Sequence, residues 1–429
     1  MHVLLIADGR SPHTVGWVNG MAQLGIRTTL LSSHVLNEQQ LGLLTVVLGP
    51  DAVHQPTDAW SWLRPRLVFA SPYRRPAMGQ AAHIDINSHT PTRRVLRLLA
   101  EVELHTAARL TSQLDRLIRI VRPDALHALR LQFEGIAATG TRTALPVAVS
   151  TWGSDLIHTG RTSDRLARRT ACALRRADLL MSDCQRDSDL APSWGLRPAA
   201  PRYVIPGNFG IDLADFPTPD PDLRAQLRLE NRPLVVYPRG IRAVVNHRGF
   251  VHAAHTLLAE NVDACFVGVG LSPLYGRQAD VPGRLLCTDN LDHRTMLRLA
   301  ACSAVTVSPS HSDGMPISVI EGMAGGAIPA CGDLASLREL ERQDAVIAWC
   351  DPGEATSIAS AVKDALRLAV DPSNRQRNRQ VVADRCTTKV AVERAGEAYQ
   401  QLDSMSPRGP ESGLSDAVPA GDPLRVTQG

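Results

Sequence analysis

Short apolar runs alternate with helical patterns along this chain, and the whole alternation occurs twice. In the first half, runs typical of buried strands cover residues 2–7, 27–33, 44–48, 124–129, 146–151 and 178–182. A long amphipathic helical pattern covers residues 93–121 and ends before Pro123. Strands separated by helices favour a parallel sheet with helices on both faces.

A second series of strand-like runs follows at residues 234–237, 264–267, 284–287, 304–307, 327–330 and 346–349. Proline and glycine cluster between the two series, from Pro201 to Pro221, which indicates a domain boundary. We therefore predict an α/β protein with a first domain at 1–205, a linker at 206–230 and a second domain at 231–385. A helix at 386–405 is expected to cross back to the first domain, and residues 406–429 have the composition of a disordered tail.

The charge balance restricts how this chain can bind anions. Its formal net charge is only +3, which does not favour a nucleic-acid partner. Lysine occurs only at Lys363 and Lys389, so an anion site must use arginine, backbone amides or helix ends. The eight cysteines form no C-x-x-C pair, and no apolar run reaches 18 residues. We therefore expect a cytoplasmic protein with reduced thiols and no membrane span.

The loop after the 304–307 run has the features of a ligand site. Ligands of doubly wound sheets bind beyond the carboxyl ends of the strands. Ser312 or Asp313 is expected to cap a helix that has Pro316 in its first turn. The free amides of residues 314–318 would then form an anion site, and Gly314 would allow close approach.

Two acids flank that expected anion site. Glu321, in the second helical turn, is suited to accept two hydroxyl hydrogen bonds from a diol such as ribose. Asp313 could reach hydroxyls of a second group beyond the phosphates. The alternative is a capped helix with one surface acid, which the glycine, the proline and the strand-end position make less favourable.

Residues 312–326, SDGMPISVIEGMAGG, resemble the E-x7-E region of retaining glycosyltransferases of family four, which have the GT-B fold. Here the first acid is Asp, and Gly322 replaces the usual Ala. The resemblance implies two Rossmann-like domains facing a central cleft. It implies catalytic roles for Arg239, Arg248, Asp313 and Glu321, with both arginines on the donor diphosphate and Arg242 as an alternative first partner. The implied donor-binding residues are Arg242, Gly314, Met315, Pro316, Ile317, Ser318 and Glu321.

The resemblance extends to two loops of the first domain that would face the acceptor. The resemblance implies that Gly16 belongs to a glycine-containing loop after the first strand, where it would allow close approach of the donor phosphates or the acceptor. The stretch STWGSD at 150–155 resembles the family's H-G-x-D loop, with Trp152 in place of His. Trp152 could stack on a sugar and Asp155 could meet an acceptor hydroxyl, whereas the alternatives are an ordinary turn and ordinary packing.

A cluster of arginines lies at positions 165, 168, 169, 175 and 176. It permits either weak contact with an anionic membrane surface or, as the favoured interpretation, a solvated helix face.

The family implies retaining transfer of a sugar from a nucleotide diphosphate sugar, of UDP or GDP type, to a hydroxyl acceptor. The acceptor would be a glycan, a lipid-linked saccharide or a small metabolite. No D-x-D motif occurs in a strand-end loop, so we expect no catalytic metal and no cofactor. A sugar-nucleotide epimerase and a non-catalytic nucleotide-sugar-binding protein remain as alternatives, and the oligomeric state is open.

Overall fold

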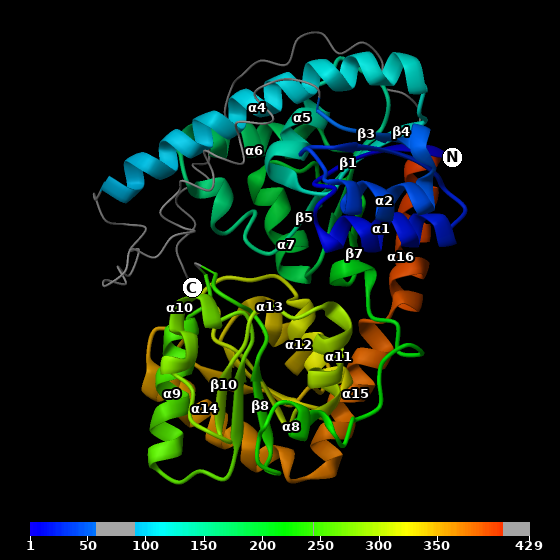
Figure 1. The fold of residues 1–429 in the computed structure, drawn as a ribbon. Helices are drawn as coiled ribbons and strands as arrows, with labels where there is room; N and C mark the ends of the chain where they lie inside the picture. Colours follow the sequence, from blue (N-terminus) through cyan, green and yellow to red (C-terminus); the bar gives the residue numbers. More distant parts are fainter. Residues whose placement is uncertain (57–90, 243, 406–429) are drawn as a thin grey trace. The chain divides into compact units, whose positions relative to one another are not determined.

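The computed structural model describes residues 1–56, 91–242 and 244–405 (Figure 1). The chain divides into two compact units, one formed by Met1–Phe209 with Ala391–Gly429 and the other by Gly210–Val390. The predicted tail at 406–429 lies outside the described residues. Within the described ranges, no helix combines the length and the apolar character needed to cross a bilayer.

The first unit contains a parallel sheet of seven strands in the order β3-β2-β1-β4-β5-β6-β7. Its strands are β1 (His2–Ala7), β2 (Arg27–Ser32), β3 (Val53–His54), β4 (Ala125–Ala128), β5 (Val147–Thr151), β6 (Leu179–Ser182) and β7 (Arg202–Val204). The strand order reverses between β1 and β4, where such sheets bind their ligands beyond the strand ends.

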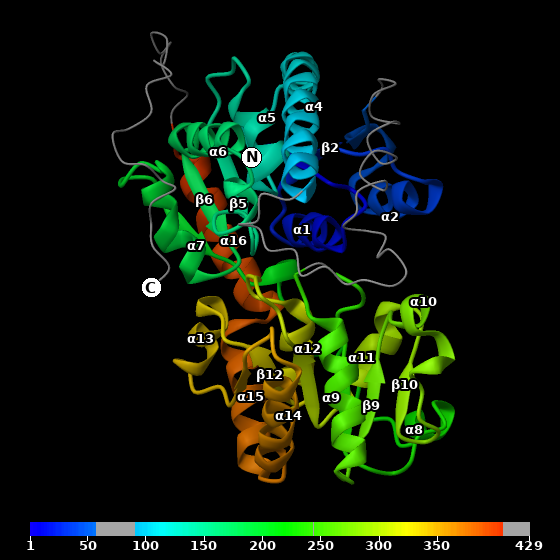
Figure 2. The same ribbon diagram turned by 90° about the vertical axis from the view of Figure 1, so that its left-hand side faces the viewer.

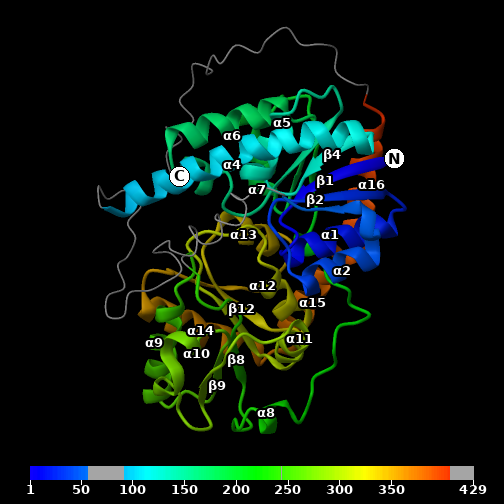
Figure 3. The ribbon, with the colours of Figure 1, turned by 45° about the horizontal axis from the view of Figure 1, so that its top comes forward.

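Helices cover both faces of this sheet because successive strand residues point to opposite sides. Leu4 and Ile6 belong to a core with α4 and α6, whereas Val3 and Leu5 belong to a core with α1 and α16 (Figure 3). The helices of this unit are α1 (Pro12–Gln23), α2 (Glu38–Leu48), α4 (Pro91–Val121), α5 (Ile136–Thr139), α6 (Asp164–Arg176), α7 (Gln185–Leu190) and α16 (Thr388–Asp403). The C-terminal helix α16 therefore packs with the N-terminal sheet.

The strand predicted at 44–48 was wrong, because these residues form the end of α2. A reciprocal cap starts this helix: the Asn37 side chain accepts from the Gln40 amide, and the Gln40 side chain accepts from the Asn37 amide. Such a cap satisfies two amides at the helix start and favours helix over strand. Only Leu44 of this helix is buried.

The second unit contains a parallel sheet of six strands in the order β10-β9-β8-β11-β12-β13. Its strands are β8 (Leu234–Tyr237), β9 (Cys265–Gly268), β10 (Leu285–Cys287), β11 (Val305–Ser308), β12 (Ile328–Gly332) and β13 (Ala348–Cys350). Its helices are α8 (Leu223–Gln226), α9 (His247–Ala259), α10 (Ser272–Tyr275), α11 (His293–Cys302), α12 (Ile317–Ala324), α13 (Ala335–Glu341), α14 (Ala355–Ala369) and α15 (Pro372–Arg385). Helices α9 and α14 lie side by side on one face of the sheet (Figure 2). Here the strand order reverses between β8 and β11.

The two chain segments that enter and leave the second unit are hydrogen-bonded to each other. The Ile211 amide donates to the Cys386 carbonyl at 2.8 Å, and the Thr388 amide donates to the Ile211 carbonyl at 3.0 Å. Gly210 has a φ of +80°, and a Cβ there would lie 2.4 Å from the Thr387 backbone. Only glycine fits at position 210 without displacing the backbone of Thr387.

Candidate functional site

The loops that follow β8 and β11 are joined by their backbones at the point where the strand order reverses. The His311 amide donates to the Val244 carbonyl at 2.8 Å, and the Asn246 amide donates to the Pro309 carbonyl at 2.9 Å. Asn246 also caps α9 by accepting from the Gly249 amide at 2.7 Å. These bonds hold the arginine-bearing loop after β8 against the loop that carries Asp313.

Arg239 and Asp313 form an ion pair between these two loops. The guanidinium Nη2 of Arg239 donates to Oδ2 of Asp313, and Nη1 makes a long contact of 3.4 Å with Oγ of Ser318. The side chains of Arg239 and Asp313 are 9% and 19% exposed, and the Arg239 Nε is buried without an acceptor in the described part of the chain. Arg239 is therefore held in place while it keeps unused donor capacity.

Arg242 adds a second positive charge next to this ion pair. Although its side chain is exposed in part, loss of surrounding water and the charge of Arg239 lower the pKa of Arg242, and Asp313 opposes that shift. Arginine remains charged at neutral pH. Two guanidinium groups and one carboxylate leave a net positive charge, which favours an anionic ligand.

Helix α12 begins beside this charge cluster, but it begins later than the sequence predicted. Pro316 occupies the cap position with ψ of 114°, outside the first turn, and no side chain within the described ranges caps the helix. The expectation that Ser312 or Asp313 caps it was wrong. Asp313 instead accepts from the Gly314 amide through Oδ1 at 3.0 Å, since the loop turns before the helix starts.

Two backbone amides remain available at the start of α12. The amides of Val319 and Ile320 donate to the Pro316 carbonyl, and that of Gly314 is used by Asp313. The amides of Ile317 and Ser318 have no acceptor among the described residues. Unsatisfied amides at a helix N-terminus favour an anion. Met315 and Ile317 pack their side chains against the core formed by α12, α13 and α15.

Glu321 lies one turn further along α12 and is held by a histidine that the sequence analysis did not consider. The Nε2 atom of His293 is 2.9 Å from Oε1 of Glu321, whose side chain is 9% exposed. The hydrogen bond to Glu321 raises the pKa of His293. His293 starts α11 and is 28 positions away in sequence, so no local spacing pattern could have indicated the pair.

The departure from alanine at position 322 has a packing explanation. A Cβ on Gly322 would lie 2.7 Å from Cγ2 and 2.8 Å from Cβ of Thr306, which is buried in β11. Helix α12 therefore approaches β11 more closely than an alanine would allow. This contact therefore sets the distance of α12, which carries Glu321, from strand β11.

Arg248 lies in the first turn of α9 and has different neighbours from Arg239. Burial lowers the pKa of His247, and the charge of Arg248 lowers it further. Burial raises the pKa of Tyr275 to about 12, with Arg248 opposing the shift. The structure therefore places Arg248 beside His247 and Tyr275, whereas Arg239, Arg242 and Asp313 gather at the start of α12.

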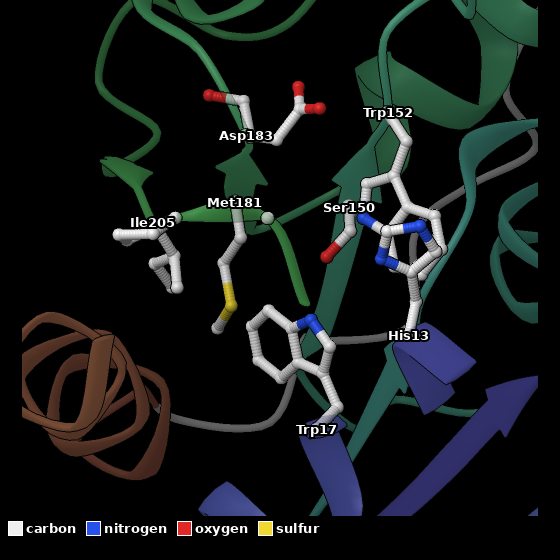
Figure 4. A pocket seen from close by; sticks show the side chains of 10 residues that line it. His13, Trp17, Ser150, Trp152, Met181, Asp183 and Ile205 are labelled. Atoms are coloured by element: carbon white, nitrogen blue, oxygen red, sulfur yellow. The ribbon is translucent and has the colours of Figure 1, made fainter. Parts of the chain in front are cut away.

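Trp152, in the first unit, lines a narrow pocket beyond the carboxyl ends of β5 and β6 (Figure 4). Its ring centroid is 4.3 Å from that of His13, with the planes at 51°. Aromatic and polar groups both face the pocket, which is lined by His13, Trp17, Ser150, Trp152, Met181, Ser182, Asp183, Ile205, Pro206 and Gly207. Aromatic faces with nearby hydroxyls are suited to polyhydroxylated ligands.

The two other acceptor-side predictions need correction. Gly16 lies inside α1 and not in a loop, because the Ser11 cap starts that helix at Pro12. Asp155 is fully buried, and its Oδ2 accepts from the Trp152 amide at 3.2 Å and the Leu131 amide at 3.4 Å. Its burial raises its pKa, while Arg130 opposes that shift. Asp155 therefore positions the loops after β4 and β5 and has no solvent-exposed surface.

The predicted arginine cluster lies on α6, and only part of it faces solvent. Arg165, Arg168 and Arg169 are exposed. Arg175 and Arg176 are partly buried, and Arg176 donates to the Thr141 carbonyl at 3.4 Å. The cluster thus contains three surface charges and two groups that pack against the protein.

A group of metal-ligand type lies near the pocket, formed by Asp183, Cys184 and Asp187. Arg186 donates to Asp187 Oδ1 at 2.7 Å, and burial raises the pKa of the Cys184 thiol well above its usual value. A guanidinium on one carboxylate and a protonated thiol do not fit a cation site.

Comparison with known proteins identifies the class of enzyme. Residues 220–381 match the sequence profile of the glycosyl transferases group 1 family. A comparison with curated protein sequences finds no match. The chain is similar in structure to sucrose-phosphate synthase from Thermosynechococcus elongatus, with TM-score 0.66, 14% identity, 94% of this chain and 99% of that chain covered.

Two further solved structures show the same fold. A glycosyltransferase from Rickettsia africae matches with TM-score 0.65, 12% identity, 94% of this chain and 99% of that chain covered. HepE from Anabaena, solved in complex with UDP-glucose, matches with TM-score 0.61, 14% identity, 94% of this chain and 100% of that chain covered. The chain is therefore a glycosyltransferase of the GT-B fold, and its second unit contains a glycosyl transferases group 1 domain.

Proposed function

We propose that this glycosyltransferase takes its sugar from a nucleotide diphosphate sugar and transfers it to a hydroxyl acceptor with retention of configuration. In this proposal the donor diphosphate binds at the reversal point of the second sheet. The observation that carries it is the position of Arg239 and the nearby charge of Arg242 at the start of α12, where the amides of Ile317 and Ser318 have no acceptor among the described residues. HepE of Anabaena, which shares the fold, was solved with UDP-glucose, and this supports a donor of that class.

The chemistry of the proposed reaction is electrostatic. Negative charge collects on the diphosphate as the bond to the sugar breaks. Preorganised guanidinium groups and backbone amides stabilise that charge without reorganisation, which lowers the barrier. Glu321 would bind the ribose diol from its buried position on α12, and Asp313 would bind hydroxyls of the sugar after releasing Arg239. The retained configuration would follow from acceptor attack on the face that the diphosphate leaves.

The first experiment measures nucleotide binding by calorimetry with UDP, GDP and ADP. We expect at least one of the three to bind, and Arg239→Ala to weaken that binding by about 10- to 100-fold, since a charge-assisted contact to phosphate is lost. Arg377→Ala is the matched control, because it removes an arginine of the same unit from a surface ion pair with Asp344. Binding by none of the nucleotides, or equal loss in both variants, would contradict the donor assignment.

The second experiment identifies the reaction. With the donor class known, a mixture of donor sugar nucleotide and candidate acceptors is followed for release of nucleotide diphosphate and for the anomeric configuration of the product by NMR. Transfer with retention supports the proposal. An epimerised donor without a glycosylated product, or an inverted product, would contradict it.

A further inference from the structure

A buried histidine links the pocket of the first unit to the C-terminal helix. His127, on β4, has no solvent exposure, and its two ring nitrogens each contact one hydroxyl. Its Nδ1 lies 2.7 Å from the Tyr399 hydroxyl of α16, and its Nε2 lies 2.9 Å from Oγ of Ser150. Ser150 lines the pocket beside Trp17 and Met181 (Figure 4). Tyr399, His127 and Ser150 thus form a continuous chain from α16 to the pocket floor.

The protonation of this chain follows from burial. Complete burial lowers the pKa of His127 to about 3, so its ring is neutral at physiological pH and has one N–H and one lone pair. Burial also raises the pKa of Tyr399 well above its usual value, which keeps its hydroxyl protonated. The neutral ring therefore donates one of its two hydrogen bonds and accepts the other. The nitrogen that faces Tyr399 thus determines what the nitrogen that faces Ser150 does.

The Tyr399 hydroxyl decides the direction. Among the described residues, His127 Nδ1 is the acceptor within reach of that hydroxyl. If His127 donated from Nδ1, the buried tyrosine proton would have no acceptor, which is unfavourable. Tyr399 therefore donates to Nδ1, and the ring carries its proton on Nε2 and donates to Ser150. The Ser150 oxygen is used as an acceptor, and its own proton is left for the pocket.

We propose that Tyr399, His127 and Ser150 form a relay of hydrogen bonds that all run in one direction, from Tyr399 to Ser150. The relay leaves the Ser150 hydroxyl free to donate a hydrogen bond to an oxygen atom of the substrate that receives the sugar. A second observation supports a ligand here: Ser182, 3% exposed, lines the same pocket, and its Oγ is buried without a partner in the described part of the chain. The pocket has room for about one water-sized group, which is the size of a single hydroxyl group. That this ligand is the acceptor rests on the proposed function, whereas the direction of the relay does not.

The relay direction excludes an alternative role for the same residues. A serine that donates to a histidine lone pair becomes a nucleophile or a base, as in acyl-transfer enzymes. Here His127 would use its N–H toward Ser150 and has no lone pair to receive the proton. Ser150 is thus a binding group, and His127 and Tyr399 are positioning residues.

The direction is tested by NMR on the full chain with ¹⁵N-labelled histidine. Long-range ¹H–¹⁵N correlations distinguish a protonated from an unprotonated ring nitrogen, and the His127 signals are assigned by their loss in His127→Gln. We expect Nε2 to carry the proton and Nδ1 to be unprotonated. The opposite tautomer, or a charged ring at pH 7, overturns the relay. This readout uses no nucleotide, so it stands apart from any failure of the donor assignment.

Ligand binding is tested with glycerol as a simple polyol, followed by the indole signals of Trp17 and Trp152. We expect a saturable shift with a weak dissociation constant, raised at least fivefold in Ser150→Ala and twofold or more in Tyr399→Phe. His127→Gln, which can still accept from Tyr399 and donate to Ser150, should bind glycerol better than His127→Leu. No saturable shift, or equal binding in wild type and Ser150→Ala, overturns the assignment of the pocket.

Discussion

Asp313 forms an ion pair with Arg239, so the acid expected to hold the donor sugar is paired with an arginine expected to hold the donor phosphate. A phosphate group that reaches Arg239 must compete with this carboxylate. In this competition the donor phosphate would displace Asp313 from Arg239. The carboxylate of Asp313 could then accept hydrogen bonds from the sugar hydroxyls. Exchange of one charge-assisted partner for another has a small net cost.

Replacing Asp313 by asparagine should separate binding from transfer. Asparagine keeps an oxygen for the Gly314 amide but removes the charge that occupies Arg239. We expect Asp313→Asn to bind UDP, or whichever nucleoside diphosphate the wild type binds, about tenfold more tightly. Transfer should fall by about 100-fold, because the charged acceptor for the sugar hydroxyls is lost. Calorimetry and a turnover assay measure the two effects, and weaker nucleotide binding in this variant would refute the competition.

Donor binding should depend on pH through His293. Its pKa is raised by Glu321, so the protonated ring and the carboxylate stabilise each other, and this interaction is lost as the pH rises through the pKa of the folded protein. Above that pH Glu321 is more available to a ribose diol. We expect the affinity for a sugar nucleotide such as UDP-glucose to rise roughly three- to tenfold from pH 6 to pH 8.

The matched variant for this pH effect is His293→Ala. It removes the titrating ring and leaves Glu321 and the arginines in place. Its affinity should be nearly constant over the same pH range and close to the alkaline value of the wild type. A sugar nucleotide is used because its phosphates do not titrate there, unlike the terminal phosphate of UDP. The same pH dependence in both proteins would exclude His293 as the cause.

The close packing of α12 on β11 should make position 322 intolerant of a methyl group. Gly322→Ala places its Cβ within 2.8 Å of Thr306 atoms, and we expect the free energy of unfolding to fall by about 1–3 kcal/mol. Gly42→Ala in α2 is the control, since a Cβ there meets nothing within 4 Å and alanine favours helix by about 1 kcal/mol. Urea denaturation compares the two, and equal stability of Gly322→Ala and wild type would show that the contact is relaxed in solution.

Transfer should persist when divalent cations are removed. In our proposal Arg239, Arg242 and the α12 amides supply the positive charge that a bound metal supplies elsewhere. We expect EDTA to change the rate by less than about twofold. Loss of activity with EDTA and recovery on addition of Mg²⁺ or Mn²⁺ would contradict this part of the mechanism.

Apart from β3 and β7, the strands of the two sheets were predictable because buried parallel strands form continuous apolar runs between turn signals. The edge strands β3 and β7 were not predicted, because they contain only two and three residues. The run at 44–48 misled the prediction, since a short apolar run is compatible with strand and helix, and the Asn37–Gln40 cap decided for helix. The ion pair of Arg239 with Asp313 was not predicted, because the sequence does not show that β8 and β11 are neighbours in the sheet. No sequence pattern could link Glu321 to His293, or His127 to Tyr399 across 272 positions, because tertiary packing alone joins them.

A crystal structure of the chain with bound UDP would test the proposed diphosphate site at the start of α12 most directly. We expect terminal phosphate oxygens about 2.9 Å from the amide nitrogens of Ile317 and Ser318, with Arg239 turned from Asp313 toward the phosphate. UDP bound with these amides still unliganded, or with the Arg239–Asp313 pair intact and the phosphates elsewhere, would contradict it.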